Sequence, residues 1–122
     1  MPKFGDLEAA VMDVLWSADG PRTIRAVLDA LAPSRPLAYT TVQTVMDRLA
    51  KKGLLVREPD GKAFTYAPAA SRDDHAARLM QAALESSADA GLALLHFVEG
   101  MDPDQQAALV EAVRRHDSAA GR

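Results

Sequence analysis

The sequence contains no cysteine among its 122 residues. Disulfide bonds, thiolate metal sites and cysteine nucleophiles are therefore excluded. The chain also lacks an apolar run near the roughly 20 residues that a membrane-spanning helix requires, and its first residues lack the pattern of a signal peptide. We therefore expect a soluble, cytoplasmic protein that makes no contact with a membrane.

Residues that hold metals or perform catalysis are equally scarce. The three histidines, His75, His96 and His116, fall in separate predicted helices without an i, i+4 pair. We expect no bound metal and no cofactor, and we expect His96, which lies in an apolar segment, to be a buried neutral imidazole. No nucleophile–base pair, glycine-rich phosphate loop or carboxylate cluster stands out, so an enzyme is not expected.

The charged residues are unevenly distributed. The formal net charge is −3, yet residues 21–62 carry eight basic and four acidic side chains, whereas residues 71–122 carry five basic and nine acidic ones. A local patch, and not the charge of the whole chain, decides whether a surface binds phosphate. The N-terminal part is therefore a candidate for nucleic-acid binding, although a merely uneven solvated surface explains the charges equally well.

Hydrophobic periodicity predicts three helices in the N-terminal half. The first covers residues 7–18 with Asp6 as its N-cap, and the second covers residues 24–32 with Thr23 as its N-cap. The third covers about residues 38–53. Three successive helices of this length are the first part of a helix-turn-helix domain.

Gly53 is suited to end the third helix, and two short strands are predicted to follow it. The segments Leu54–Glu58 and Lys62–Ala67 have the composition of strands, and the sequence Pro-Asp-Gly between them is typical of a tight turn. This order predicts that residues 54–67 form the wing of a winged helix-turn-helix domain over residues 1–70. The alternative is a three-helix bundle with an unrelated hairpin.

Three further helices are predicted after residue 70. Ser71 and Asp102 are candidate N-caps, Pro103 suits a first helical position, and residues 117–122 are expected to fray. These helices carry more apolar surface than a short arm can bury against itself, so we expect two copies of the chain to bury it mutually. The residues expected in this homodimer interface are Leu79, Met80, Leu84, Leu94, Leu95, Phe97, Val98, Leu109, Val110 and Val113. The predicted fold is thus mainly α with a small β-hairpin: a winged helix-turn-helix followed by a helical dimerisation region over residues 71–122.

The third predicted helix has an unusual polar face. Its apolar stripe is Val42, Val45, Met46 and Leu49, yet threonines, each costing up to about 0.7 kcal/mol of helix propensity relative to alanine, stand beside or opposite this stripe. Threonine offers a hydroxyl to either base type and a methyl to thymine, glutamine pairs with adenine, and the N-terminal part of such a helix enters the major groove. The predicted DNA-binding residues on this helix are Thr40, Thr41, Gln43, Thr44, Arg48 and Lys51.

Other roles stay open for some of these residues. Thr40 or Thr41 also suits the N-cap of the helix. Asp47 is an awkward acid on a DNA-binding face, where it is suited to accept a hydrogen bond from a cytosine amino group or to orient Arg48. Lys62, at the tip of the hairpin, completes the predicted DNA-binding set, because it can contact phosphate or the minor groove.

Three segments together resemble a known family. LEAAVMDVLW (residues 7–16), TTVQTVMDRLAKKGLL (residues 40–55) and FTYAP (residues 64–68), in this order and spacing, resemble the penicillinase-repressor family of transcriptional repressors (BlaI/MecI/CopY type). The resemblance covers almost the whole chain. It implies a homodimer whose N-terminal winged helix binds a palindromic operator of double-stranded DNA and whose C-terminal helical region forms the dimer. It also places the polar positions of the third helix on the recognition helix, and Lys62 on the wing.

The branches of this family differ in how repression is relieved. In the beta-lactam branch, a membrane sensor-protease leads to cleavage of the repressor just before a Phe in an Asn-Phe-Val-Glu type sequence; the matching bond here joins His96 to Phe97, and the Asn is replaced by His96. In the copper branch, cysteines near the C-terminus bind metal, and this chain has none. The sequence therefore predicts a homodimeric DNA-binding repressor relieved by an unknown signal, with C-terminal proteolysis by a sensor protease as one candidate. The alternative is a winged-helix module whose third helix docks a partner protein.

Overall fold

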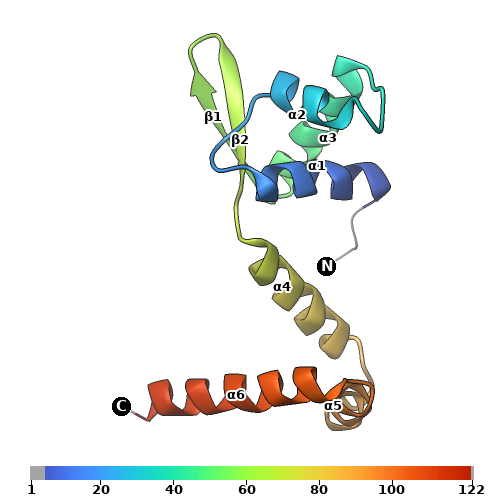
Figure 1. The fold of residues 1–122 in the computed structure, drawn as a ribbon, viewed down its shortest axis with the longest axis vertical. Coiled ribbons are helices and arrows are strands. Elements are labelled where there is room, and N and C mark those ends of the chain that lie inside the picture. Colours follow the sequence, from blue (N-terminus) through green and yellow to red (C-terminus); the bar gives the residue numbers. More distant parts are fainter. Residues whose placement is uncertain (1–4, 122) are drawn as a thin grey trace. The chain divides into compact units, whose positions relative to one another are not determined.

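The computed structural model describes residues 5–121 and forms two compact units. Along the described chain, six helices and one hairpin follow in the order drawn in Figure 1. The elements are α1 (Asp6–Ser17), α2 (Ile24–Leu31), α3 (Tyr39–Lys51), β1 (Leu55–Asp60), β2 (Ala63–Pro68), α4 (Arg72–Glu85), α5 (Ala90–Glu99) and α6 (Pro103–Ala120). The boundary between the units falls between Leu79 and Met80, inside α4. Three helices followed by a hairpin is the predicted winged-helix order.

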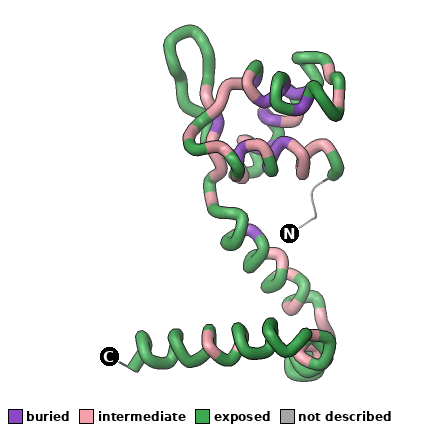
Figure 2. Tube along the Cα trace, in the orientation of Figure 1, coloured by how far each residue is buried: buried purple, intermediate pink, exposed green. Residues whose placement is uncertain are grey.

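The N-terminal unit is built around one apolar core (Figure 2). Each of its elements contributes the apolar side of its own pattern, so that α1, α2, α3 and both strands meet at this core. Its buried residues are Val11, Met12, Leu15, Ile24, Val27, Leu28, Leu31, Val42, Met46, Leu49, Leu55 and Tyr66. The predicted apolar stripe of α3 is buried except at Val45, which is half-buried at the edge of the core.

The hairpin is antiparallel, with a register that runs from Leu55 opposite Pro68 to Asp60 opposite Ala63. Both strands lie one or two residues later than predicted, so the tight turn is centred on Gly61 and Lys62 and Pro59 falls outside its central positions. Gly61 occupies the first central position of a two-residue turn with φ 64°, a conformation that glycine supplies at no steric cost. Proline is tolerated in a strand with an open edge, and Pro59 is paired with Phe64 in the ladder.

Two helix starts differ from the prediction. Gly5, and not Asp6, is the N-cap of α1, and its backbone N–H donates to the Glu8 carboxylate at 3.1 Å. Ala38 is the N-cap of α3, so Thr40 and Thr41 lie inside the helix and neither of them caps it. A cap is therefore not the reason for the threonines of α3.

Two other predicted helix signals are confirmed. The hydroxyl of Thr23 accepts from the backbone N–H of Ala26 at 3.1 Å and caps α2. Gly53 has φ 80° and follows the last residues of α3. Its N–H bonds to the Ala50 carbonyl and the next N–H, of Leu54, bonds to the Leu49 carbonyl. This pair of bonds is a Schellman motif, which turns the chain sharply into the hairpin.

The C-terminal helices have the predicted caps. Asp102 accepts from the N–H of Gln105 at 2.8 Å, and Pro103 is the first residue of α6. The prediction that the chain frays from residue 117 is wrong for the described residues, because α6 continues to Ala120. None of the helices within residues 5–121 is long and apolar enough to cross a membrane.

Candidate nucleic-acid interface

The burial of one side of α3 leaves its polar side exposed. Val42, Met46 and Leu49 are completely buried, so the opposite face of this helix is in contact with solvent. All six residues that the sequence predicted for DNA binding on this helix are exposed there: Thr40, Thr41, Gln43, Thr44, Arg48 and Lys51. The helix therefore presents short hydroxyls and an amide at its N-terminal half and cations toward its C-terminal end.

Thr44 is held by its own helix. Its hydroxyl donates to the backbone carbonyl of Thr40 at 2.9 Å, one turn earlier. This bond uses the only hydrogen of the hydroxyl, so the side chain keeps an acceptor lone pair and a methyl group for an outside ligand. Both match features of the major groove: the lone pair fits a base amino group, and the methyl fits thymine.

Asp47 contacts the wing and not the neighbouring Arg48. The phenol hydroxyl of Tyr66, on β2, donates to the Asp47 carboxylate at 2.8 Å, and Asp47 is half-buried. Burial of the phenol, together with this carboxylate, raises the pKa of Tyr66 above its usual value. The structure thus gives Asp47 a contact with Tyr66 in place of one with Arg48, while the carboxylate keeps further acceptor lone pairs, so acceptance from a cytosine amino group stays a prediction.

Two arginines lie over aromatic rings next to the predicted residues. The Arg57 guanidinium lies 4.3 Å from the ring centre of Phe64, across the hairpin, and Arg25 lies 5.4 Å from the ring centre of Tyr39, the first residue of α3. Such stacking orders a guanidinium while its N–H groups stay available to an anion. Sequence reasoning missed these two pairs, because the partners lie on different elements. Lys62, which it did select, is exposed at the turn of the hairpin.

Lys52 has a structural partner. Its ammonium lies 3.1 Å from the Glu8 carboxylate and so ties the end of α3 to α1. The backbone N–H of Gly5, followed by Lys52, holds the pKa of Glu8 below its ordinary value. This lysine is therefore distinct from Lys51, whose exposed side chain belongs to the polar face of α3.

A second cluster joins α1 to the start of α4 within the N-terminal unit. The indole N–H of Trp16 donates to the carbonyl of Ala70 at 3.0 Å, and the ring of His75 lies 5.5 Å from that of Trp16. Arg72 lies over the same indole and pairs with Asp13 at 2.8 Å. Burial, and then the charge of Arg78, lowers the pKa of His75 below its usual value. This cluster fixes the first turn of α4.

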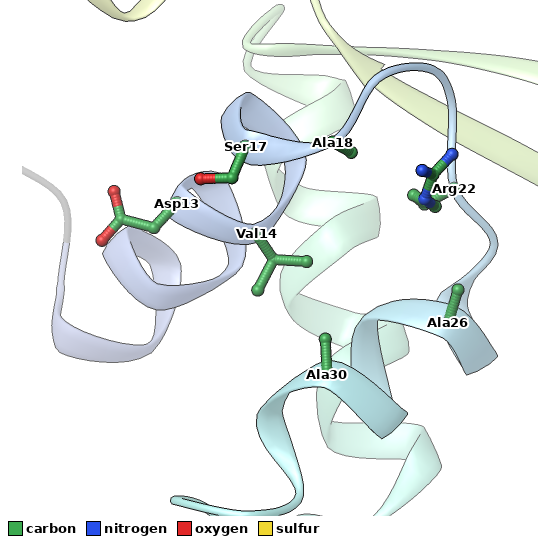
Figure 3. Close-up of a pocket in the computed structure, with 7 residues that line it drawn as sticks. All are labelled: Asp13, Val14, Ser17, Ala18, Arg22, Ala26 and Ala30. Atoms are coloured by element: carbon green, nitrogen blue, oxygen red, sulfur yellow. The ribbon is translucent and has the colours of Figure 1, made fainter.

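The N-terminal unit has a groove to which α3 contributes no lining residue. It measures about 510 Å³ between α1 and α2 and is lined by Asp13, Val14, Ser17, Ala18, Arg22, Ala26 and Ala30 (Figure 3). Its walls are mostly small side chains, and Arg22 at its edge is already paired with Asp19 at 2.6 Å. Within residues 5–121, no group of three or more metal-binding side chains is arranged to hold an ion.

The C-terminal unit leaves its apolar side chains uncovered. Six of the ten residues predicted for the dimer interface are exposed in the single chain: Met80, Leu94, Leu95, Phe97, Val110 and Val113. The other four, Leu79, Leu84, Val98 and Leu109, are half-buried. His96 is exposed, which contradicts the expectation of a buried imidazole in the single chain. The bond that joins it to Phe97 lies inside helix α5.

Comparison with known proteins finds a matching family model and similar proteins. The penicillinase repressor family model matches residues 4–115. The transcriptional regulator BlaI of Mycobacterium tuberculosis is 46% identical over 124 residues, which covers 99% of this chain and 90% of the relative. The penicillinase repressor of Bacillus licheniformis is 32% identical over 75 residues, which covers 62% of this chain and 58% of the relative.

Two solved structures resemble the N-terminal part. The solution structure of the DNA-binding domain of the repressor BlaI has a TM-score of 0.53 and 32% identity, and the match covers 60% of this chain and 88% of that one. The solution structure of monomeric Bacillus licheniformis BlaI with the blaP half-operator has a TM-score of 0.50, with the same identity and coverage. The family model and the Mycobacterium tuberculosis relative cover most of the chain, and the chain belongs to the penicillinase repressor family.

Proposed function

We propose that this chain is a homodimeric transcriptional repressor that acts in the cytoplasm and binds a palindromic operator through α3 and the wing. The observation that carries this proposal is the exposed polar face of α3 on an otherwise well-buried helix. Solvated helices are better served by straight-chain residues than by threonine. Hydroxyl, methyl and amide groups at the N-terminal half of a recognition helix are suited to read base edges in the major groove.

The relatives support this proposal. One of the solved repressor structures contains a half-operator, and its similarity to this chain covers the unit that holds α3 and the hairpin. The proposed contacts divide into two kinds. Thr40, Thr41, Gln43 and Thr44 face bases, whereas Arg48, Lys51 and the wing residue Lys62 neutralise phosphates. Phosphate contacts supply sequence-independent affinity that falls with salt concentration, and base contacts supply the preference for one site.

The exposed side chains of the C-terminal unit support a dimer. None of the residues of α5 and α6 (90–120) is buried in the single chain, although α5 carries Leu94, Leu95 and Phe97 around its surface. Exposed apolar side chains in this number are typical of a subunit interface. A second copy is the partner we propose, because a two-fold dimer presents two identical recognition helices to the two halves of a palindrome.

Relief of repression is proposed to involve the same region. Cleavage between His96 and Phe97 by a sensor protease would divide α5 and so remove part of the dimer surface. Because this bond lies in a helix, a protease requires local unwinding of α5 before it can bind the segment in an extended form.

The proposal is tested by a gel shift with DNA from upstream of the gene of this protein. A dimer on a palindrome gives one discrete complex, and 5 bp inserted between the half-sites places them on opposite faces of the duplex and weakens this complex strongly. An insertion of 10 bp restores the face and is the control. Binding that ignores both insertions contradicts the two-fold mode, and the absence of any DNA complex would direct the search to protein partners of α3.

A further inference from the structure

The two parts of the proposed DNA-binding surface come from elements of very different rigidity. Helix α3 is anchored by three completely buried side chains. The hairpin has only two strands, and a two-stranded hairpin is marginally stable by itself. Apart from Leu55, every residue of β1 is exposed, and Tyr66 is the only buried residue of β2 within the described strand. The orientation of the wing therefore depends largely on how Tyr66 is held.

Tyr66 is held at both its backbone and its side chain. Its N–H and C=O pair with the C=O and N–H of Arg22 at 2.8 and 3.0 Å, which attaches the strand to the segment before α2. Its ring is 1% exposed, and its hydroxyl reaches α3, where it donates to Asp47 at 2.8 Å. This last bond directly joins the hairpin to the recognition helix.

Asp47 lies close to the residues proposed to read bases. It follows Thr44 by three positions and Gln43 by four, so the three side chains are neighbours on the surface of α3. A carboxylate at this place opposes phosphate, and a helix optimised only for affinity would not carry it. Acceptance of the hydrogen bond from Tyr66 explains why an acid stands at this position, whereas contact with DNA phosphate does not explain it.

We propose that the hydrogen bond between Tyr66 and Asp47 is a positioning contact, which fixes the wing relative to α3 so that Lys62 and the polar face of α3 engage one operator half-site together. Neither residue needs to touch DNA for this role. The inference rests on the proposed function, because it concerns the operator complex of the same two elements.

The hydrogen bond between Tyr66 and Asp47 lies far from the tip of the hairpin, so a small rotation at Tyr66 moves the tip by a large distance. Lys62 is four residues from Tyr66, which corresponds to roughly 13 Å along an extended strand. A rotation of about 15° at the level of Tyr66 would move the tip by about 3 Å over this length, which is enough to separate an ammonium from a phosphate oxygen. Loss of one hydroxyl at the base is therefore expected to abolish a contact at the tip that the hydroxyl itself does not make.

The test is a double-mutant cycle on the full-length chain, with affinity for the upstream operator measured by fluorescence anisotropy. Lys62→Ala is introduced into wild type and into Tyr66→Phe. We expect Lys62→Ala to weaken binding about three- to tenfold in wild type and less than about twofold in Tyr66→Phe, because the wing has already lost its place. Two residues that do not touch would then be coupled through the orientation of the hairpin.

Three further variants separate positioning from a general loss of stability. Asp47→Ala removes the acceptor, so the affinity cost of Lys62→Ala is expected to be as small in this variant as in Tyr66→Phe. Asp47→Asn keeps an acceptor oxygen without charge, so this cost is expected to be as large as in wild type. The matched control is Ile24→Val, which removes one methyl group from the same core. It is expected to leave the cost of Lys62→Ala unchanged, because it weakens folding without moving the wing.

Each outcome decides a different point. An equal cost of Lys62→Ala in wild type and in both Tyr66→Phe and Asp47→Ala, including no cost in any of them, overturns the positioning role and leaves the repressor proposal intact. If the affinity cost of Lys62→Ala also disappears in Ile24→Val, the cycle reports only the stability of the fold. This result also overturns the positioning role. If wild type shows no preference for the operator, the proposed function fails and the inference fails with it.

Discussion

The hydroxyl of Thr44 donates to the carbonyl of Thr40 at 2.9 Å, so one threonine of the proposed readout face is oriented by another. A hydroxyl turned back to the helix leaves the methyl as the branch that is not held by the protein. Thr44 is therefore a rigid side chain with an apolar end, and its rigidity limits the entropy that is lost when DNA binds. The two kinds of atom on its Cβ can be separated by substitution.

Replacement of Thr44 by serine or by valine distinguishes its methyl group from its hydroxyl. Serine loses the methyl, which is worth about 0.8 kcal/mol when buried against thymine, so Thr44→Ser is expected to weaken operator binding about fourfold for each half-site. Thr44→Val keeps the methyl and is expected to bind more tightly than Thr44→Ser. Anisotropy titrations on the operator check this order, and the reverse order would show that the oxygen makes the important contact.

The buried imidazole of His75 predicts a loss of stability in acid. Its pKa is lowered in the folded protein, mainly by burial, so the folded state binds its proton more weakly than the unfolded state does. The contribution of His75 is complete above the unfolded pKa of about 6.5 and is lost as the pH falls below this value toward the lower folded pKa. Arg72 and Arg78 on α4 and Asp13 on α1 are the charged groups near this cluster.

The measurement for His75 is the melting temperature of the protein between pH 8 and pH 5. Wild type is expected to lose stability over this interval more steeply than His75→Gln, which has no proton to gain. His116→Gln, at an exposed position of α6, is the matched control and is expected to follow wild type. Parallel curves for wild type and His75→Gln would show that His75 does not cause the acid sensitivity.

The cap of α2 predicts a purely structural effect. Thr23→Ala removes the acceptor for the N–H of Ala26 and is expected to reduce the free energy of unfolding by about 1 kcal/mol. Thr23→Ser keeps the oxygen and is expected to lose only a few tenths of this amount. Urea unfolding followed by circular dichroism provides the measurement, and equal losses in the two variants would show that the hydroxyl is not the stabilising group.

The exposed face of α6 predicts where the proposed dimer can be broken. Val110 is 67% exposed in the single chain, and a charge placed there would have to be desolvated in an interface, so Val110→Glu is expected to shift the protein from dimer to monomer at micromolar concentration. Ser118→Glu, near the end of the same helix, is the control. Sedimentation velocity measures the change, and an unchanged dimer in Val110→Glu would place the interface elsewhere.

The sequence predicted the elements better than the contacts between them. The apolar stripe of α3 and the caps at Thr23 and Asp102 are local signals, which depend on residues within one or two turns, and these predictions are confirmed. The hairpin was predicted, but both strands begin and end one or two residues later than expected, because the positive φ of Gly61 places the turn at Gly61 and Lys62, and composition alone does not fix that position.

Contacts across the fold could not be predicted in the same way. Tyr66 and Asp47 are nineteen residues apart, and Arg57 meets Phe64 only because the hairpin register brings them together. No periodicity within one element indicates such pairs. The exposed polar face of α3 was predictable, because the side opposite a buried stripe is fixed by helix geometry alone.

The central proposal is that the polar face of α3 reads bases, and one titration tests it most directly. Binding of wild type, Gln43→Ala and Thr44→Ala is measured on the upstream operator and on a scrambled duplex at two salt concentrations, with Thr65→Ala on β2 as a matched control. We predict that the two α3 variants lose affinity for the operator and keep their salt-sensitive affinity for the scrambled duplex, while Thr65→Ala behaves as wild type does. Equal affinity of wild type and both α3 variants for the two duplexes would contradict base reading by this face.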